Sequence, residues 1–292
     1  MRTLTILLAI VAMLALAVPV QGWPSNVFTN DTGNSLWSDA GNWSLGRPPT
    51  GAPYYDHAYV YNDLTAVITS DVTNGYYNCG FVGCDKSIGH VVMNGGTLSP
   101  GGNDVLYIGF KVYTEGCDFI QSGGTINDSR IWVGPGAYGN CYGKYEISGG
   151  SIHSPNRSLK LGIIFIGNDE GTGIFKVVGH APEEIQFGEY QQSSLSTLAF
   201  ELDGGSDPIQ QIDVSGTATL AGTLEISGTA DVGTYTLMTY ESKNGDFDTI
   251  IKPDGWTVDV GATTITVTVP EPATLILLGI GGLGVLLRRK PR

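Results

Sequence analysis

One pattern occurs three times in the middle of the chain: residues 91–98 (VVMNGGTL), 119–126 (FIQSGGTI) and 145–152 (YEISGGSI). In each copy, apolar residues lead into a pair of glycines, and successive glycine pairs are 28 and 26 residues apart. A fourth, degenerate copy begins at Phe175. A second strand-like segment recurs out of phase with the first, at residues 106–109, 131–134 and 164–167. The repeating unit is therefore a strand, a glycine turn, a second strand and a glycine-rich loop.

This unit favours a β-solenoid. Side chains alternate between the two faces of a strand, so Tyr145 and Ile147 share one face while Glu146 and Ser148 share the other. Glycine adopts positive φ freely, which allows a sharp turn. One unit cannot bury its apolar face alone, whereas stacked copies can. We predict an all-β fold, a parallel β-helix that is right-handed as parallel crossovers are, with Tyr145 and Phe175 stacked in register.

Gln121 is the exception within the repeats. It occupies the position that Met93, Ile147 and Val177 fill in the other copies, where an apolar side chain is expected. Either the amide pairs with a polar neighbour, or the predicted register is wrong at this position.

The segments on both sides of the repeats at residues 76–194 have a different character. After residue 195, short strands divided by glycines recur closely, so residues 195–269 either continue or cap the solenoid or form a small β-sandwich. Residues 23–75 are expected to form an N-terminal cap with the first turns, and the sequence around Trp37 and Trp43 resembles the opening segment of bacterial surface solenoids. These tryptophans would cover the open strand edges. The alternative is that they stack on sugar rings as glycan contacts.

The composition fits an extracellular β protein and excludes nucleic-acid binding. The 292 residues include 42 glycines, and only 15% of them are charged. Outside residues 1–22 and 270–292, the body has 10 basic and 27 acidic residues. This charge repels nucleic-acid phosphates. No motif supports a defined metal site, and no cofactor is expected.

The four cysteines are Cys79, Cys84, Cys117 and Cys141. An exported protein meets an oxidising compartment, so disulfide bonds are permitted. Pairing Cys79 with Cys84 and Cys117 with Cys141 is one of three connectivities. The spacing lacks paired CxxC motifs, which argues against a zinc site.

The sequence motifs typical of enzymes are either absent or lack the structural context that they require. A GxGxxG string at residues 134–139 follows a strand, but no amphipathic helix comes next, and the second string at residues 279–284 lies within an apolar run. The four histidines are dispersed, with no HExxH or GxSxG motif. The sequence therefore predicts no catalytic residues and a protein that is not an enzyme.

The N-terminus has the features of an export signal. Arg2 precedes an apolar run at residues 4–18, and the small residues at 20–22 provide a cleavage site, with Ala17 as the alternative. The run is too short, and polar sequence follows too soon, for a first transmembrane helix. Residues 1–22 are therefore a predicted signal peptide, which implies the Sec translocon as a partner.

The C-terminus has a three-part organisation. Pro270, Glu271 and Pro272 precede an apolar run at residues 273–287, which is followed by four basic residues, Arg288, Arg289, Lys290 and Arg292. This organisation resembles the PEP-CTERM sorting signal, which implies an exosortase, a membrane protease-transpeptidase, as a partner. Independently, basic residues beside an apolar span stay on the cytoplasmic side and act as a stop signal, which places the body outside. We expect residues 270–292 to contain a transmembrane helix.

Together these features predict a secreted, non-enzymatic structural protein of the cell surface or extracellular matrix. The body resembles the passenger repeats of bacterial surface proteins such as autotransporters. The C-terminal helix would anchor the protein transiently in the inner membrane before it reaches the surface. The alternative is a β-helix protein that binds or cleaves polysaccharide, and an exopolysaccharide is a partner under either hypothesis.

Overall fold

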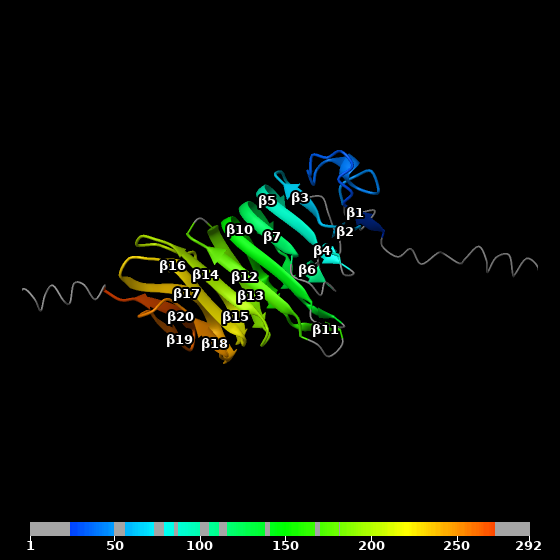
Figure 1. Cartoon of the computed structure of the whole chain (residues 1–292). Helices are drawn as coiled ribbons and strands as arrows, with labels where there is room; N and C mark the ends of the chain where they lie inside the picture. Colours follow the sequence, from blue (N-terminus) through cyan, green and yellow to red (C-terminus); the bar gives the residue numbers. More distant parts are fainter. Residues whose placement is uncertain are drawn as a thin grey trace, which may run out of the picture.

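The computed structural model of the chain describes residues 24–49, 56–72, 79–84, 87–99, 105–110, 116–137, 141–166, 170–180 and 182–271. The predicted signal peptide and the C-terminal apolar run lie outside these ranges, so the hydrophobic helices expected at both ends stay predictions. The described chain is an all-β solenoid of about six turns, with strands of successive turns side by side along its length (Figure 1). Its parallel pairing confirms the predicted β-solenoid, while the right-handed winding stays a prediction.

The central turns contribute strands to three faces, and the turns at the two ends contribute strands to fewer. The first face contains β1 (Ser25–Val27), β2 (His57–Val60), β4 (Cys79–Cys84), β6 (Val105–Phe110), β8 (Arg130–Val133) and the C-terminal parts of β10 (Tyr142–Leu161), β13 (Pro182–Gln192), β15 (Ile212–Leu220) and β17 (Gly233–Gly245). The second contains β3 (Leu64–Ile68), β5 (Gly89–Leu98), β7 (Asp118–Asn127), the start of β10, β12 (Thr172–Val178), β14 (Thr197–Asp203), β16 (Thr223–Thr229) and β18 (Thr249–Ile251). The third contains the remaining parts of the long strands β5, β7, β10, β13, β15 and β17. Beside them, β9 (Gly136–Ala137) pairs with β11 (Ile164–Ile166).

The core consists of ladders of apolar side chains that stack from turn to turn. On the second face, Tyr145 pairs with Phe119 on one side and with Phe175 on the other, as the sequence predicted. The ring centroids are 5.0 Å and 5.1 Å apart, the spacing of adjacent parallel strands. Ile147 lies in the neighbouring ladder and is fully buried, which confirms the inward register. Stacking of this kind buries apolar surface at every turn, although no single turn has a core of its own.

The glycine pairs form the corner between the second and third faces. Gly96, Gly124 and Gly150 all have positive φ, at 74°, 77° and 78°. A Cβ on Gly124 would lie 2.5 Å from the carbonyl oxygen of Gly96, and one on Gly150 would lie 2.1 Å from that of Gly124. Only glycine therefore fits this close stack of corners. The corner is a bend with register shifts inside continuous strands, rather than the separate turn that the sequence suggested.

Gln121 points inward in the predicted register, and its amide is satisfied by hydrogen bonds. The Tyr145 hydroxyl donates to Gln121 Oε1, and Gln121 Nε2 donates to the carbonyls of Gly124 at 3.0 Å and Ser151 at 3.1 Å. Complete burial raises the pKa of Tyr145 well above its ordinary value, so the hydroxyl remains a donor. A second buried pair, Tyr190 with Gln192, repeats the arrangement on the first face.

The C-terminal end differs from the repeats. From β14 to β18 the strands continue the parallel stacking of the preceding turns within the same 18-stranded sheet. Two strands then end the fold, β19 (Thr257–Val260) and β20 (Thr264–Val269), and β20 reverses direction and pairs antiparallel with both β17 and β19. This hairpin covers the otherwise open edge of β17 and closes the end of the solenoid.

Candidate functional site

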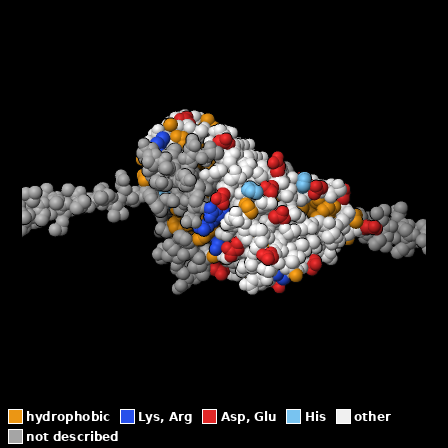
Figure 2. All heavy atoms as spheres, turned by 180° about the vertical axis from the view of Figure 1, so that it is seen from behind, with side chains coloured by type: hydrophobic (Ala, Val, Ile, Leu, Met, Phe, Trp, Pro, Cys, Tyr) orange, Lys and Arg blue, Asp and Glu red, His pale blue; other side chains and the backbone are white. Residues whose placement is uncertain are grey.

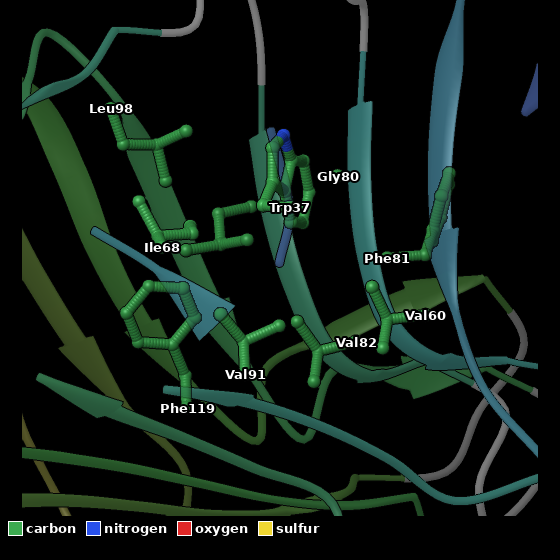
Figure 3. Close-up of a pocket in the computed structure, with 10 residues that line it drawn as sticks. Trp37, Val60, Ile68, Gly80, Phe81, Val82, Val91, Leu98 and Phe119 are labelled. Carbon is green, nitrogen blue, oxygen red and sulfur yellow. The ribbon is translucent and has the colours of Figure 1, made fainter. Parts of the chain in front are cut away.

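Trp37 and Trp43 lie inside the N-terminal cap. Their exposed fractions are 5% and 3%, their ring centroids are 4.7 Å apart, and Trp43 Nε1 donates to the carbonyl of Trp37 at 2.7 Å. The Trp37 amide donates to the carbonyl of Val67 at 2.9 Å, which fixes the cap on the second face. Trp37 lines a small apolar cavity of about 10 Å³ at the end of the core (Figure 3). Because both rings are buried, a sugar could stack on them only if the cap opened, and the glycan-contact hypothesis for these tryptophans stays a prediction.

A second group of aromatic side chains lines the outer side of the first face. Tyr59 stacks on Phe81 with a centroid distance of 4.8 Å, and Phe81 stacks on Tyr107 at 5.0 Å. Trp132 meets the edge of this ladder, and Lys160 Nζ lies 5.3 Å from the Trp132 ring centroid. Phe81 and Tyr107 are only 9% and 5% exposed, so this ladder stabilises the stacking of turns more than it offers a surface.

Cys117 and Cys141 are both buried. Burial raises the pKa of the Cys117 thiol to about 11, so the thiol is protonated and unreactive at neutral pH. The side chains of Cys79 and Cys84 lie outside the described part of the chain. The disulfide connectivities stay predictions, and among the described residues no cluster of three or more potential metal ligands occurs.

The exposed charged residues form pairs across neighbouring turns. Lys176 contacts Glu201 at 2.5 Å and Glu146 at 4.0 Å, and Arg157 contacts Asp128 at 2.8 Å. On the face shown in Figure 2, acidic side chains are widely scattered, and several basic side chains lie left of centre with acidic neighbours, while others lie at the upper left and at the lower edge. Pairs of this kind hold adjacent turns together.

His90 bridges three consecutive turns. Its Nδ1 lies 2.8 Å from Asp118 Oδ1, and its Nε2 lies 3.1 Å from Asp63 Oδ1. Partial burial lowers the pKa of His90, but hydrogen bonds and charges from the two carboxylates outweigh it, so the pKa is raised above 6.5. When it is protonated, the imidazole lies between two carboxylates and joins the three turns.

The predicted sorting motif begins where the C-terminal cap ends. Val269, the last residue of β20, pairs with Gly233 of β17 and is buried. Pro270 and Glu271 follow at once, and both are exposed. Pro272 and the basic residues Arg288, Arg289, Lys290 and Arg292 lie outside the described part of the chain. Within the residues that the structure describes, no helix has the length and apolarity of a membrane span.

Comparison with known proteins identifies this C-terminal segment alone. The profile of the PEP-CTERM protein-sorting motif matches residues 268–290, which confirms the resemblance seen in the sequence. No curated protein and no solved structure matches the chain. The motif indicates a secreted surface protein with a membrane-anchored sorting signal that an exosortase processes. It carries no information about what the solenoid body does.

Proposed function

We propose that this chain is a non-enzymatic structural protein of the cell surface or extracellular matrix, sorted by an exosortase after export through the Sec translocon. The observation that carries the proposal is the direct joining of a sorting signal to the capped end of a continuous β-solenoid. The sorting signal indicates how the protein reaches the surface, and the rigid, elongated fold of the body suits a structural role there. An exopolysaccharide of the same surface is the expected neighbour of the mature protein.

The arrangement of the ionisable side chains supports a structural role for the body. Catalytic sites that cleave polysaccharide bring acids and bases together so that their pKa values separate. The paired charges on the described outer faces instead join neighbouring turns, as Lys176 and Glu201 do. The buried polar groups Gln121 and Tyr145 satisfy each other inside the core. The chemistry of these side chains is thus directed at holding the stack together.

Expression of the full chain in an exosortase-bearing host, and in the same host without the exosortase, tests the sorting route. We expect a mature form that ends near Pro270 at the surface or in the medium of the first host, by mass spectrometry, and an uncut form in the membranes of the second. Glu271→Ala should slow processing, whereas Glu241→Ala, an exposed acid of β17, should not. A mature form that keeps the apolar run and basic tail would reduce the signal to a plain anchor.

The non-enzymatic character has its own test. The mature protein is incubated with the exopolysaccharide of its host, and new reducing ends and unsaturated sugars are measured against heat-inactivated protein. We expect no increase of either product. Sustained, protein-dependent release of oligosaccharides would instead establish the alternative, a polysaccharide-cleaving β-helix.

A further inference from the structure

A groove of about 320 Å³ opens near the C-terminal end of the solenoid, on the corner between the second and third faces. The segments that follow β12 and β14 form one wall, and the beginning of β17 forms the other. Residues from three successive turns therefore meet there, although they are far apart in the sequence. The polar lining consists of the His180 imidazole, the Asp207 carboxylate, the Gln210 amide and the Thr236 hydroxyl. The Tyr235 ring and the Ile209 side chain supply the apolar part of the lining.

Backbone hydrogen bonds fix the shape of the groove. The Gln210 amide donates to the carbonyl of Gly179 at 3.0 Å, which ties the wall to the preceding turn. The Asp231 amide donates to the carbonyl of Gly205 at 3.0 Å, which ties it to the following turn. The Tyr235 hydroxyl donates to the carbonyl of Asp231 at 2.7 Å and holds the ring in place. A groove held in this way loses little conformational freedom when a ligand binds.

The polar groups of the groove remain accessible. His180 Nε2 lies 3.3 Å from Asp207 Oδ2, and the two side chains are 50% and 70% exposed. The pair therefore keeps free carboxylate lone pairs and faces solvent, unlike the satisfied amide of Gln121 in the core. Ile209 is buried beneath the groove and, with the Tyr235 ring, supplies apolar surface.

We propose that this groove binds a short stretch of an uncharged polysaccharide. Sugar hydroxyls can donate to Asp207 and exchange hydrogen bonds with Gln210 and Thr236, while the apolar side of a sugar ring packs on Tyr235. The described lining contains no lysine or arginine, and the body is strongly acidic, which disfavours phosphorylated, sulfated or uronic-acid chains. The volume lies at the lower end of the range for small-molecule sites. This binding role goes beyond the structural role and does not depend on it.

Isothermal titration calorimetry of the full chain tests the proposal. The detergent must lack a sugar headgroup, because a maltoside would compete for the groove. The probes are five neutral hexasaccharides: maltohexaose, cellohexaose, laminarihexaose, xylohexaose and mannohexaose. Hexagalacturonate is the anionic control. We expect saturable binding of at least one neutral probe with a Kd of about 1 mM or tighter, and weaker binding of hexagalacturonate.

Variants locate the binding. Asp207→Ala should weaken binding of the neutral probe about tenfold, because it removes the carboxylate to which sugar hydroxyls donate. The fold should persist, because this exposed carboxylate makes few contacts that folding needs. Tyr235→Ala should do the same, with circular dichroism to check its fold. Asp254→Ala and Tyr61→Ala, which lie outside the groove, serve as matched controls and should bind as the unaltered protein does. Failure of all five neutral probes overturns the proposal and leaves the sorting route intact. So does an affinity of Asp207→Ala and Tyr235→Ala that equals the affinity of the unaltered protein.

Discussion

The hydrogen bond between Tyr145 and Gln121 offers a direct test of the stacked core. Both side chains are fully buried, and the Tyr145 ring is stacked between Phe119 and Phe175. The hydroxyl reaches across one turn to Gln121 Oε1, while Gln121 Nε2 is already committed to two carbonyls. Tyr145→Phe therefore removes a single donor and keeps the stacked ring.

The expected loss follows from the amide oxygen that remains. An unpaired buried acceptor costs about 1–3 kcal/mol, since no water replaces the lost donor. In a protein of this length, each kcal/mol lowers the melting temperature by about 2–4 °C. Tyr145→Phe should therefore lower the Tm by roughly 2–12 °C in differential scanning calorimetry. Tyr190→Phe, which breaks the equivalent bond to Gln192, should show a loss of similar size.

A double variant separates the hydrogen bond from the packing. Met93 fills the position of Gln121 one turn earlier, so Gln121→Met replaces the amide with a side chain that this ladder already accepts. Gln121→Met alone leaves the Tyr145 hydroxyl unpaired, whereas Gln121→Met with Tyr145→Phe removes both polar groups. The double variant should be less destabilised than the sum of the two single variants, and the difference measures the coupling.

An unchanged Tm for Tyr145→Phe would refute this reasoning, because it would mean that the Gln121 oxygen has another partner or that water reaches it. Tyr61→Phe, at a more accessible position, is the control and should leave the Tm unchanged. Strict additivity in the double variant would likewise show that the two side chains do not interact.

Three further predictions follow from the same structure. Ile147→Asp should cost several kcal/mol, because it buries an unpaired carboxylate between turns, and an unchanged Tm would place residue 147 in solvent. The stability that His90 contributes is complete below about pH 6.5 and is lost as the pH rises through its raised folded value, so His90→Gln should lower the Tm more at about pH 5.5 than at about pH 8.5. An equal loss at both pH values would show that His90 acts by packing alone. A flexible insertion of about ten residues between Val269 and Pro270 moves the cleavage motif away from the folded cap, so it should speed exosortase processing without changing the Tm. Unaltered processing would show that the folded cap does not hinder the enzyme.

The repeats could be predicted from the sequence because the alternation of side chains and the spacing of the glycines agree with the stacking of the turns. Alternation assigned Tyr145 and Ile147 to the interior, and the glycine spacing set the register of Tyr145 on Phe175. The two explanations offered for Gln121 were resolved in favour of a polar partner. That partner lies on the next turn, so only the stacked structure identifies it as Tyr145.

Other features had no signal in the sequence. The strand β20 has the same alternating pattern whether it pairs parallel or antiparallel, so its reversal against β17 could not be foreseen. The groove brings His180, Asp207 and Tyr235 together from three turns whose loops share no motif. Its residues could be found only after the register had placed those loops next to one another.

The position of the sorting signal links processing to the stability of the body. β20 is both the strand that closes the solenoid and the segment that leads into the signal, and Val269 is still paired with Gly233. A cut on the C-terminal side of Val269 leaves every strand of the cap in place. A cut within β20 would remove part of the cap and expose the edge of β17, which invites aggregation. The first described residue and the last lie at opposite ends of the solenoid (Figure 1), so a body held by its uncut signal is attached at the capped C-terminal end. The body can therefore be cut from its signal and stay folded only because the Pro270–Pro272 motif begins where the last strand, β20, ends.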